Sequence, residues 1–304
     1  MRTVAAHDVL GRAGDAAARA GVPLFLVGGA VRDLLLRTAS KDVDLAAEGP
    51  AASALALARR LAAVPGWRLV AAHERFGTAT LDAPGALRVD VAATRTETYP
   101  RPAALPVVST GASIGDDLSR RDFTIHAMAR RVGEHGELGP TIDPHGGRGD
   151  LRSETLRLLH DRSIVDDPTR AFRAIRYAVR LGFRLEPCFG QRLRRAREAA
   201  AFPALSGDRL RRALFEVLRE PDVRRAVELL TRFALLDDIC PGWSEDLRKR
   251  IPPKAIEEPA PPFAAADLRM AWILGPLSSL KRTAIAERLR FSRALRRSAG
   301  IPRR

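Results

Sequence analysis

The sequence of 304 residues contains little cysteine and few aromatic residues. Its two cysteines, Cys188 and Cys240, are too few and too far apart for a disulfide framework or a zinc cluster. We therefore expect a reducing compartment and a packing role for both thiols. Aromatic residues make up only 5% of the chain, which argues against a surface of many exposed rings as the means of holding a single-stranded nucleic acid.

Long apolar runs are also missing. No apolar segment has the length that spans a bilayer, and no basic-then-apolar signal opens the chain. We therefore expect a cytoplasmic protein without a membrane partner. The hydrophobic content of 46% fills a core, and the length suits two domains or one domain with a helical extension.

Acidic residues are outnumbered by basic ones. The 51 Lys and Arg against 36 Asp and Glu give a formal net charge of +15, part of which we attribute to codon bias. A polyanion releases counterions when basic side chains replace them, so the excess predicts an acidic partner. RNA, DNA and an anionic membrane surface all fit, and charge alone does not choose among them.

The most informative segment begins with the apolar residues 24–27, which predict a short buried strand. Gly28 and Gly29 come directly after it and allow the backbone to approach a ligand closely. Residues 30–37 favour a helix, whose first N–H groups and Arg32 would face an anion lying on the glycines. A glycine pair after a strand is usually only a tight turn, so the prediction of a phosphate site depends on the residues beyond this helix.

Two acids come next. In a strand that starts at Asp42, alternation places Asp42 and Asp44 on one face and Val43 on the other. Parallel carboxylates repel unless a cation separates them, and Mg²⁺ is the cation that carboxylates, water and substrate phosphates usually hold together. Asp90, flanked by valines in a predicted strand at residues 87–92, is our candidate for a third carboxylate; the alternative is a structural Asp at a sheet edge.

These residues carry a resemblance. Gly-Gly-Ala-Val-Arg-Asp at residues 28–33, followed by Asp-Val-Asp at 42–44, resembles the class II tRNA nucleotidyltransferase and bacterial poly(A) polymerase family, within the polymerase-β-like nucleotidyltransferases. Arg-Arg-Asp-Phe-Thr-Ile-His-Ala at 120–127 resembles a second element of that family, with His126 in the usual place of an asparagine. The resemblance implies catalysis with Mg²⁺ and assigns site residues, namely Asp42 and Asp44 as metal ligands, Asp90 as third acid, and Gly28, Gly29, Arg32, Arg121 and Asp122 as nucleotide-binding groups.

Asp122 and His126 also have a structural interpretation. Asp122 is suited to cap the following helix or to pair with an arginine. We interpret His126 as a structural histidine rather than a general base, because a carboxylate or solvent can accept the proton in metal-assisted phosphoryl transfer. His160 and Asp161 form a dyad in sequence that we interpret as accidental.

A second informative segment surrounds Pro168. Asp167 and Arg170 resemble the pair that reads the incoming base in the family, although Asp166 replaces the usual Glu. The chemistry fits, because an Asp accepts from an exocyclic amine and an Arg donates to a ring nitrogen or carbonyl. The helix predicted here also carries Arg173 and Arg176, which face the triphosphate or pair with acids of the fold.

Residues 95–109, with three prolines, exclude a regular helix or a central strand and predict an ordered or mobile loop. In the resembled family this region assists the switch from adding C to adding A. It is a few residues shorter here than expected, which leaves a CC-adding enzyme open. By the same resemblance, Arg209 and Glu216 match positions that brace the base-reading helix, and the proline-rich residues 251–262 predict a linker.

We expect an α+β fold: a nucleotidyltransferase head with a mixed sheet over residues 1–150, a helical neck over 151–240, and a short helical RNA-binding body or tail over 241–304. The expected activity is template-independent addition of C and/or A to the 3′ end of tRNA from CTP and ATP, with Mg²⁺ and release of pyrophosphate. The alternatives are a poly(A) polymerase and a non-catalytic RNA-binding relative. No protein partner is implied.

Overall fold

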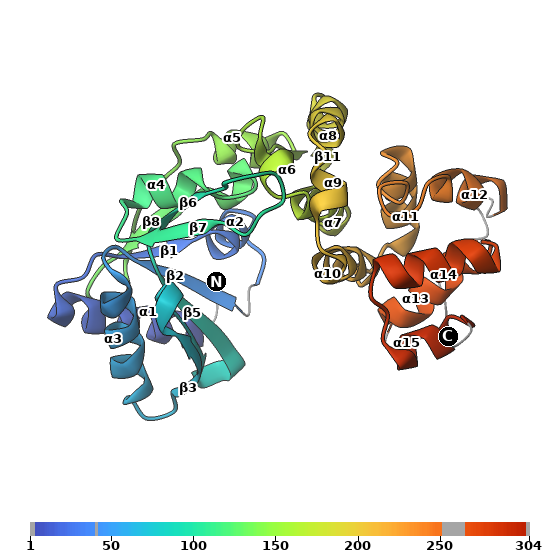
Figure 1. The fold of residues 1–304 in the computed structure, drawn as a ribbon. Coiled ribbons are helices and arrows are strands. Elements are labelled where there is room, and N and C mark those ends of the chain that lie inside the picture. The colour runs from blue at the N-terminus through green and yellow to red at the C-terminus, as the bar shows by residue number, and fades with distance from the viewer. Residues whose placement is uncertain (1–3, 40–41, 251–264, 302–304) are drawn as a thin grey trace. The chain divides into compact units, whose positions relative to one another are not determined.

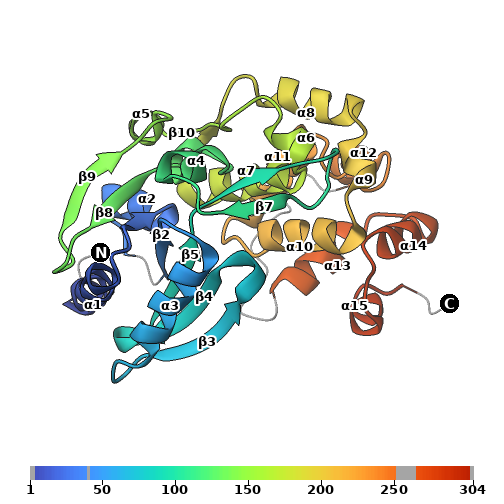
Figure 2. The same ribbon diagram turned by 60° about the vertical axis from the view of Figure 1, so that its left-hand side comes forward.

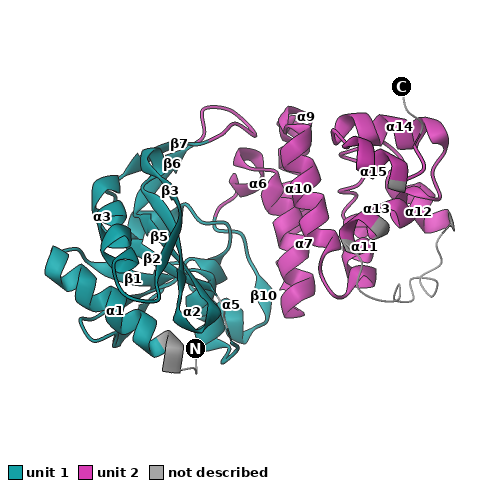
Figure 3. Cartoon of the chain, turned by 90° about the horizontal axis from the view of Figure 1, so that it is seen from below, with its two compact units in different colours: residues 1–98, 106–159 teal, residues 99–105, 160–304 magenta. Residues whose placement is uncertain are grey.

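The computed structural model describes residues 4–39, 42–250 and 265–301. The chain forms two compact units (Figure 3). The first comprises Met1–Thr98 and Pro106–Leu159, and the second Tyr99–Leu105 and His160–Arg304. The expected α+β class is confirmed. The division into head, neck and body at residues 150 and 240 stays a prediction.

The first unit is built on a seven-stranded sheet with the order β3-β4-β5-β2-β1-β8-β9 (Figure 1). β2 and β5 run parallel, and the other neighbouring strands run antiparallel, so the sheet is mixed as expected. All four residues of β1 are buried, which explains its uninterrupted apolar sequence. The strands are β1 Leu24–Val27, β2 Asp42–Ala47, β3 Arg68–His73, β4 Thr78–Ala83, β5 Leu87–Ala93, β8 Ala129–Val132 and β9 Leu138–Ile142.

Helices cover this sheet. α3 buries Ala54, Leu57, Ala58 and Leu61, whose spacing of three and four residues gives one apolar face, and it packs on β4, β5 and α1. The other helices and short elements of this unit are α1 Val4–Ala20, α2 Gly29–Leu35, α4 Ile114–Ser119, α5 Gly147–Arg152, the 3₁₀ turns η1 Glu74–Phe76, η2 Pro84–Ala86 and η3 Thr124–His126, and strand β10 Thr155–Leu156.

The loop predicted over residues 95–109 is wrong at both ends of that segment and right for residues 99–106 between them. β6 (Arg95–Thr98) and β7 (Val107–Thr110) form an antiparallel hairpin of their own (Figure 2). Its prolines, at positions 100, 102 and 106, lie in the connection between the two strands, where no ladder hydrogen bond needs their missing N–H. The prolines therefore mark the tip of the hairpin.

The second unit is helical. α7 (Thr169–Leu181) buries Phe172, Ile175 and Val179 as the sequence predicted, ends at Gly182 with φ 75°, and packs against α10 (Gly207–Leu218). The predicted linker at 251–262 lies outside the described residues. The remaining elements are α6 Ser163–Asp166, β11 Arg184–Leu185, α8 Phe189–Glu198, α9 Ala201–Ala204, α11 Val223–Arg232, α12 Trp243–Arg250, α13 Ala265–Leu274, α14 Ser279–Arg288 and α15 Arg293–Ser298.

Arginines join the ends of these helices. Among the described residues, five of them each donate to two backbone carbonyls at or beside a helix end, where the helix cannot satisfy all of its own carbonyls. Arg269, for example, bonds the carbonyls of Leu218 and Glu220 at 2.6 and 2.8 Å. The full set is Arg197, Arg211, Arg225, Arg269 and Arg288. Within the described residues, no helix combines the length and apolarity that crossing a bilayer requires.

Candidate active site

The two glycines after β1 lie against charged groups. Gly28 has φ 66° and ψ −131°, which favours glycine, and a Cβ there would lie 2.7 Å from Nη1 of Arg121. A Cβ on Gly29 would lie 3.7 Å from Nη2 of Arg32 and 3.9 Å from Oδ2 of Asp44. Side chains at these positions would therefore fill space beside two guanidinium groups and a carboxylate.

The predicted carboxylates lie on neighbouring strands. β2 and β5 are parallel, and their register places Asp44 opposite Asp90 and Asp42 opposite Arg88. The hydroxyl of Thr80 on β4 donates to Oδ1 of Asp90. The pKa of Asp44 is raised from 3.8 to about 6, chiefly by burial and then by the charge of Asp90. Asp42 adds to the rise, and Arg121 and Arg32 oppose it. The carboxylates thus repel one another enough to favour a proton or another cation between them.

The donor set suits a hard cation. Asp42 and Asp44 offer carboxylate oxygens from one face of β2, and among the described residues no group of three or more His, Cys, Asp or Glu side chains is placed to hold a metal. A metal here would take two protein ligands and complete its shell with water and phosphate oxygens, which is the usual arrangement for Mg²⁺. The residues present fit that ion.

Arg32 is held by a buried chain of polar contacts. Its side chain is 8% exposed; Nη2 lies 2.7 Å from Oδ1 of Asp33, and Nη1 lies 2.7 Å from Nε2 of His126. Nδ1 of His126 lies 3.0 Å from Oδ1 of Asp122, which also accepts from the Phe123 N–H. Because a guanidinium only donates, Nε2 accepts and Nδ1 carries the proton. His126 thereby orients Arg32, and its structural role rather than a role as general base stays a prediction.

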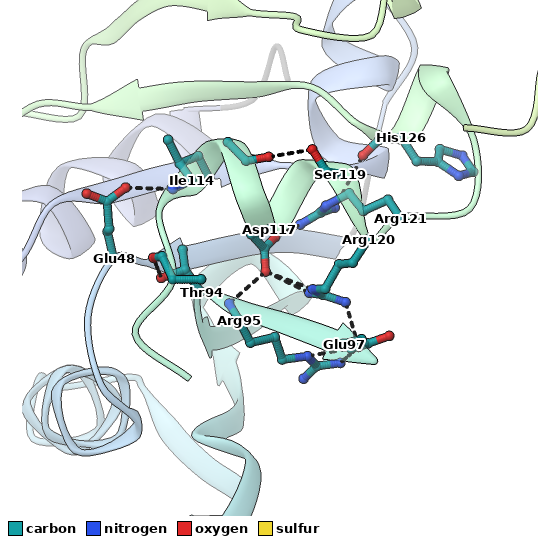
Figure 4. A network of polar contacts seen from close by, with 12 residues as sticks. Glu48, Thr94, Arg95, Glu97, Ile114, Asp117, Ser119, Arg120, Arg121 and His126 are labelled. Atoms are coloured by element: carbon teal, nitrogen blue, oxygen red, sulfur yellow. Dashed lines mark hydrogen bonds and ion pairs between the residues drawn. The ribbon is translucent and has the colours of Figure 1, made fainter. Parts of the chain in front are cut away.

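Arg121 is fixed by an acid that sequence reasoning missed. Figure 4 shows Asp117 of α4 facing Arg120 and Arg121, with which it forms ion pairs of 2.8 and 2.9 Å. Burial alone would raise the pKa of Asp117, but the two guanidinium groups outweigh it and hold that pKa below its ordinary value. Arg120 also forms an ion pair of 2.9 Å with Glu97 of β6. One network of ion pairs therefore joins α4 to the hairpin of β6 and β7.

In the helical unit, Asp167 is anchored through one oxygen. Its Oδ1 accepts from the Thr169 N–H at 3.0 Å, the Thr169 hydroxyl at 2.7 Å, and Nη2 of Arg209 at 2.9 Å. Within the described parts of the chain, Oδ2 accepts no hydrogen bond. Nη1 of Arg209 donates to the carbonyl of Ala103 at 2.6 Å, and buried Arg170 lies over the ring of Tyr99. One carboxylate oxygen is therefore fixed and the other is available to a ligand.

The two remaining arginines differ. Arg176 pairs with Glu216 and Glu220 at 2.8 and 2.9 Å, so it binds acids of the fold. Arg173 lies over Tyr177, 5.4 Å from the ring centre. The structure thus groups the predicted site residues in two sets: the first unit holds Gly28, Gly29, Arg32, Asp42, Asp44, Asp90, Arg121 and Asp122, and the second holds Asp167, Arg170, Arg173 and Arg176.

The chain is similar to known proteins in sequence and in structure. Residues 24–157 match the family model described as the poly A polymerase head domain. The chain is 40% identical over 239 residues to the A-adding tRNA nucleotidyltransferase of Geobacter sulfurreducens, covering 79% of this chain and 26% of that protein. It is 42% identical over 179 residues to the A-adding tRNA nucleotidyltransferase of Halalkalibacterium halodurans, covering 59% and 40%.

The chain therefore spans only about a quarter to two fifths of the length of these curated relatives. The similarity to solved structures covers a larger share of both chains. A CCA-adding enzyme in an apo form matches with a TM-score of 0.76 and 33% identity, covering 95% of this chain and 68% of that one. The chain thus belongs to the family of class II tRNA nucleotidyltransferases and bacterial poly(A) polymerases.

Proposed function

We propose that the protein is a template-independent nucleotidyltransferase that adds C and/or A to the 3′ end of tRNA from CTP or ATP and releases pyrophosphate. The observation that carries this proposal is the group of carboxylates on β2 and β5 beside Gly28, Gly29 and two guanidinium groups. Support comes from similar structures described as a Thermotoga maritima CCA-adding enzyme complexed with tRNA and as a CCA-adding enzyme with ATP. Because the proposed substrate is tRNA, we also propose a cytoplasmic location.

Nucleotidyltransferases of this kind generally use a divalent metal. In this protein Asp42 and Asp44 are proposed to hold Mg²⁺, which when bound supplies positive charge to the attacking and leaving oxygens. The N–H groups after Gly28, together with Arg32 and Arg121, are proposed to bind the triphosphate. These groups keep the reactive phosphate in position while charge moves to the leaving group.

The reaction balances with the groups present. The 3′-hydroxyl oxygen of the RNA bonds to the α-phosphorus, the bond from that phosphorus to the bridging oxygen breaks, and pyrophosphate leaves with the electron pair. The hydroxyl proton goes to a carboxylate, for which we propose Asp90 because its register partner is Asp44.

Asp167 and Arg170 are proposed to read the base. The available Oδ2 of Asp167 accepts from the exocyclic amine that C and A share, and Arg170 donates to a ring nitrogen or carbonyl. U and G lack an amine at that position of the Watson–Crick edge, so an acceptor there selects against them.

Extension assays test the function directly. Transcripts of tRNA ending before CCA, after C and after CC are incubated with Mg²⁺ and labelled CTP or ATP, and the products are separated at single-nucleotide resolution. We expect one A on the transcript ending in CC, because relatives named as A-adding match 59–79% of the chain. Two C residues alone would indicate CC addition, a long A tail a poly(A) polymerase, and RNA binding without extension a non-catalytic relative.

His126 gives a separate prediction. Replacing His126 by Ala removes the acceptor that orients Arg32, and we expect the KM for nucleotide to rise about tenfold, the effect of losing one buried hydrogen-bond partner. His126→Asn retains an acceptor and a donor and should largely restore the KM. Steady-state kinetics at saturating tRNA measure both. A fall in kcat with unchanged KM would contradict a positioning role for His126.

A further inference from the structure

Arg121 lies close to Asp44 without pairing with it. A Cβ on Gly28 would lie 2.7 Å from Nη1 of Arg121 and 3.8 Å from Oδ2 of Asp44, so both groups border the same small space. Between these two described side chains the structure contains no ion pair. A guanidinium group this near to a partly buried carboxylate is attracted to it. Another contact therefore holds Arg121 away from Asp44.

Two groups hold the end of the Arg121 side chain. Its Nη2 donates to Oδ2 of Asp117 at 2.9 Å, and its Nη1 donates to the carbonyl oxygen of His126 at 3.3 Å. Among the described residues, Asp117 is the one acid with which Arg121 pairs. Nε of Arg121 is buried and donates to no group that the structure describes. The guanidinium group is therefore fixed at Nη2 and keeps a donor for a ligand.

Asp117 is itself firmly anchored. Its side chain is buried, and its Oδ1 accepts from Nε and Nη2 of Arg120 at 3.0 and 2.8 Å and from the Arg95 N–H at 3.2 Å (Figure 4). Although burial raises the pKa of Asp117, Arg120 and Arg121 lower it by more, so the carboxylate is ionised at neutral pH. One oxygen thus anchors Asp117, and the other presents its charge to Arg121.

We propose that Asp117 is a positioning residue that keeps Arg121 off Asp44, so that Asp44 stays available to Mg²⁺ and Arg121 stays available to the triphosphate. This inference rests on the proposed function, which assigns the metal to Asp44 and the triphosphate to Arg121. A guanidinium group paired with Asp44 would neutralise a carboxylate that a divalent ion needs. It would also use donors that the phosphate oxygens need.

A purely structural role for Asp117 leads to a different expectation. The bonds of Asp117 to Arg120 and to the Arg95 N–H also join α4 to β6. If Asp117 only braced these elements, its loss would weaken metal binding equally with and without Arg121. A positioning role acts through Arg121 and disappears when Arg121 is removed. A double-mutant cycle between the two positions therefore separates the two roles.

The test is Mg²⁺ binding by the full chain without RNA or nucleotide. The apparent Kd is obtained from the rise of the Tm with the concentration of MgCl₂. We expect Asp117→Asn to raise this Kd about tenfold, because an amide has no charge to hold Arg121 against the attraction of Asp44. In an Arg121→Gln background the same change should alter the Kd less than about twofold, since no guanidinium group remains to occupy Asp44.

Two matched variants and a second probe complete the design. Arg120→Gln breaks the ion pair with Glu97 but leaves the pair of Asp117 and Arg121, and Asp116→Asn makes the same chemical change at an exposed acid of α4. Both should leave the Kd for Mg²⁺ unchanged. Calorimetric titration with pyrophosphate in excess MgCl₂ should show weaker binding in Asp117→Asn and in Arg121→Gln, with no further loss in the double variant. Thermal melts without metal confirm that each variant folds.

Three results would overturn the role of Asp117: unchanged Mg²⁺ binding in Asp117→Asn, an equal loss in the Arg121→Gln background, or an equal loss in Arg120→Gln. The last two would show that Asp117 only braces the fold. The titrations require no nucleotide transfer, so the expected coupling in a protein that extends no RNA would refute the proposed function alone. Extension of tRNA by a protein without that coupling would refute this inference alone.

Discussion

Replacing Asp44 by Asn is expected to stabilise the metal-free protein while lowering the rate of nucleotide transfer about 10³-fold. Folding raises the pKa of Asp44 from 3.8 to about 6, mainly through burial and then through Asp90. The folded state therefore prefers the protonated carboxyl. The stability that goes with this preference is complete below pH 3.8 and is lost as the pH rises through about 6. At neutral pH the ionised Asp44 destabilises the fold, and Asn removes that charge.

The expected gain in the free energy of unfolding at pH 7 is about 1–3 kcal/mol, since each pKa unit corresponds to about 1.4 kcal/mol and solvent screens part of the shift. It should vanish near pH 4. Urea unfolding of wild type and Asp44→Asn between pH 4 and 8, without divalent metals, measures the difference. A variant less stable than wild type at pH 7 would contradict this account.

Whereas the stability of Asp44→Asn should rise, its activity and its metal binding should fall. Loss of one proposed metal ligand should lower kcat about 10³-fold, because several kcal/mol of charge stabilisation disappears. MgCl₂ should raise the Tm of the wild type and have little effect on Asp44→Asn, since an ion stabilises only the state that binds it. Near-normal transfer by Asp44→Asn would refute the assignment of Asp44 as a metal ligand.

The second large effect concerns the choice of base. Asp167→Asn is expected to lower kcat/KM for the preferred nucleotide about 10- to 100-fold, because one charge-assisted hydrogen bond to the exocyclic amine is lost. Discrimination against UTP and GTP should fall as well, since an amide offers both a donor and an acceptor. Single-turnover incorporation with each of the four nucleotides measures both quantities.

A matched control lies on α10. Asp208→Asn makes the same chemical change at an acid that pairs with Arg211 and Arg290, and it should leave base choice unaffected. Arg209→Ala, which removes one of the three hydrogen bonds to Oδ1 of Asp167, should relax base choice while leaving the Asp167 charge in place. If Asp167→Asn discriminates as the wild type does, another group reads the base.

Local patterns were sufficient for the elements that carry the proposed catalytic acids. Alternation predicted Asp42 and Asp44 on one face of a strand and Asp90 on a strand of its own, and β2 and β5 have those positions. The register that brings Asp44 opposite Asp90 depends on which strands pair, and no local pattern encodes that choice.

Contacts between residues that are far apart in the sequence were not predicted, for the same reason. Arg32 and His126 are 94 residues apart, and the only signal in the sequence is a histidine where the resembled family has asparagine. The ion pairs of Asp117 could have been predicted from the sequence. Asp117 precedes Arg120 and Arg121 by three and four residues, which is the spacing of neighbours on a helix. The hairpin at β6 and β7 was mistaken for a loop because prolines at its tip were taken to describe the whole segment.

The arginines that bond helix ends show that the basic residues of this chain do more than supply net charge. Of 51 basic residues only Lys41, Lys249, Lys254 and Lys281 are lysines, so almost all of the positive charge belongs to a side chain that can donate to two carbonyls at once. A redesigned chain with lysine in place of arginine would attract RNA from a distance just as strongly. It would lose about 1 kcal/mol at each of the five junctions, because an ammonium group does not span two carbonyls in the same way. In this chain the same guanidinium groups supply positive charge and hydrogen bonds between helices.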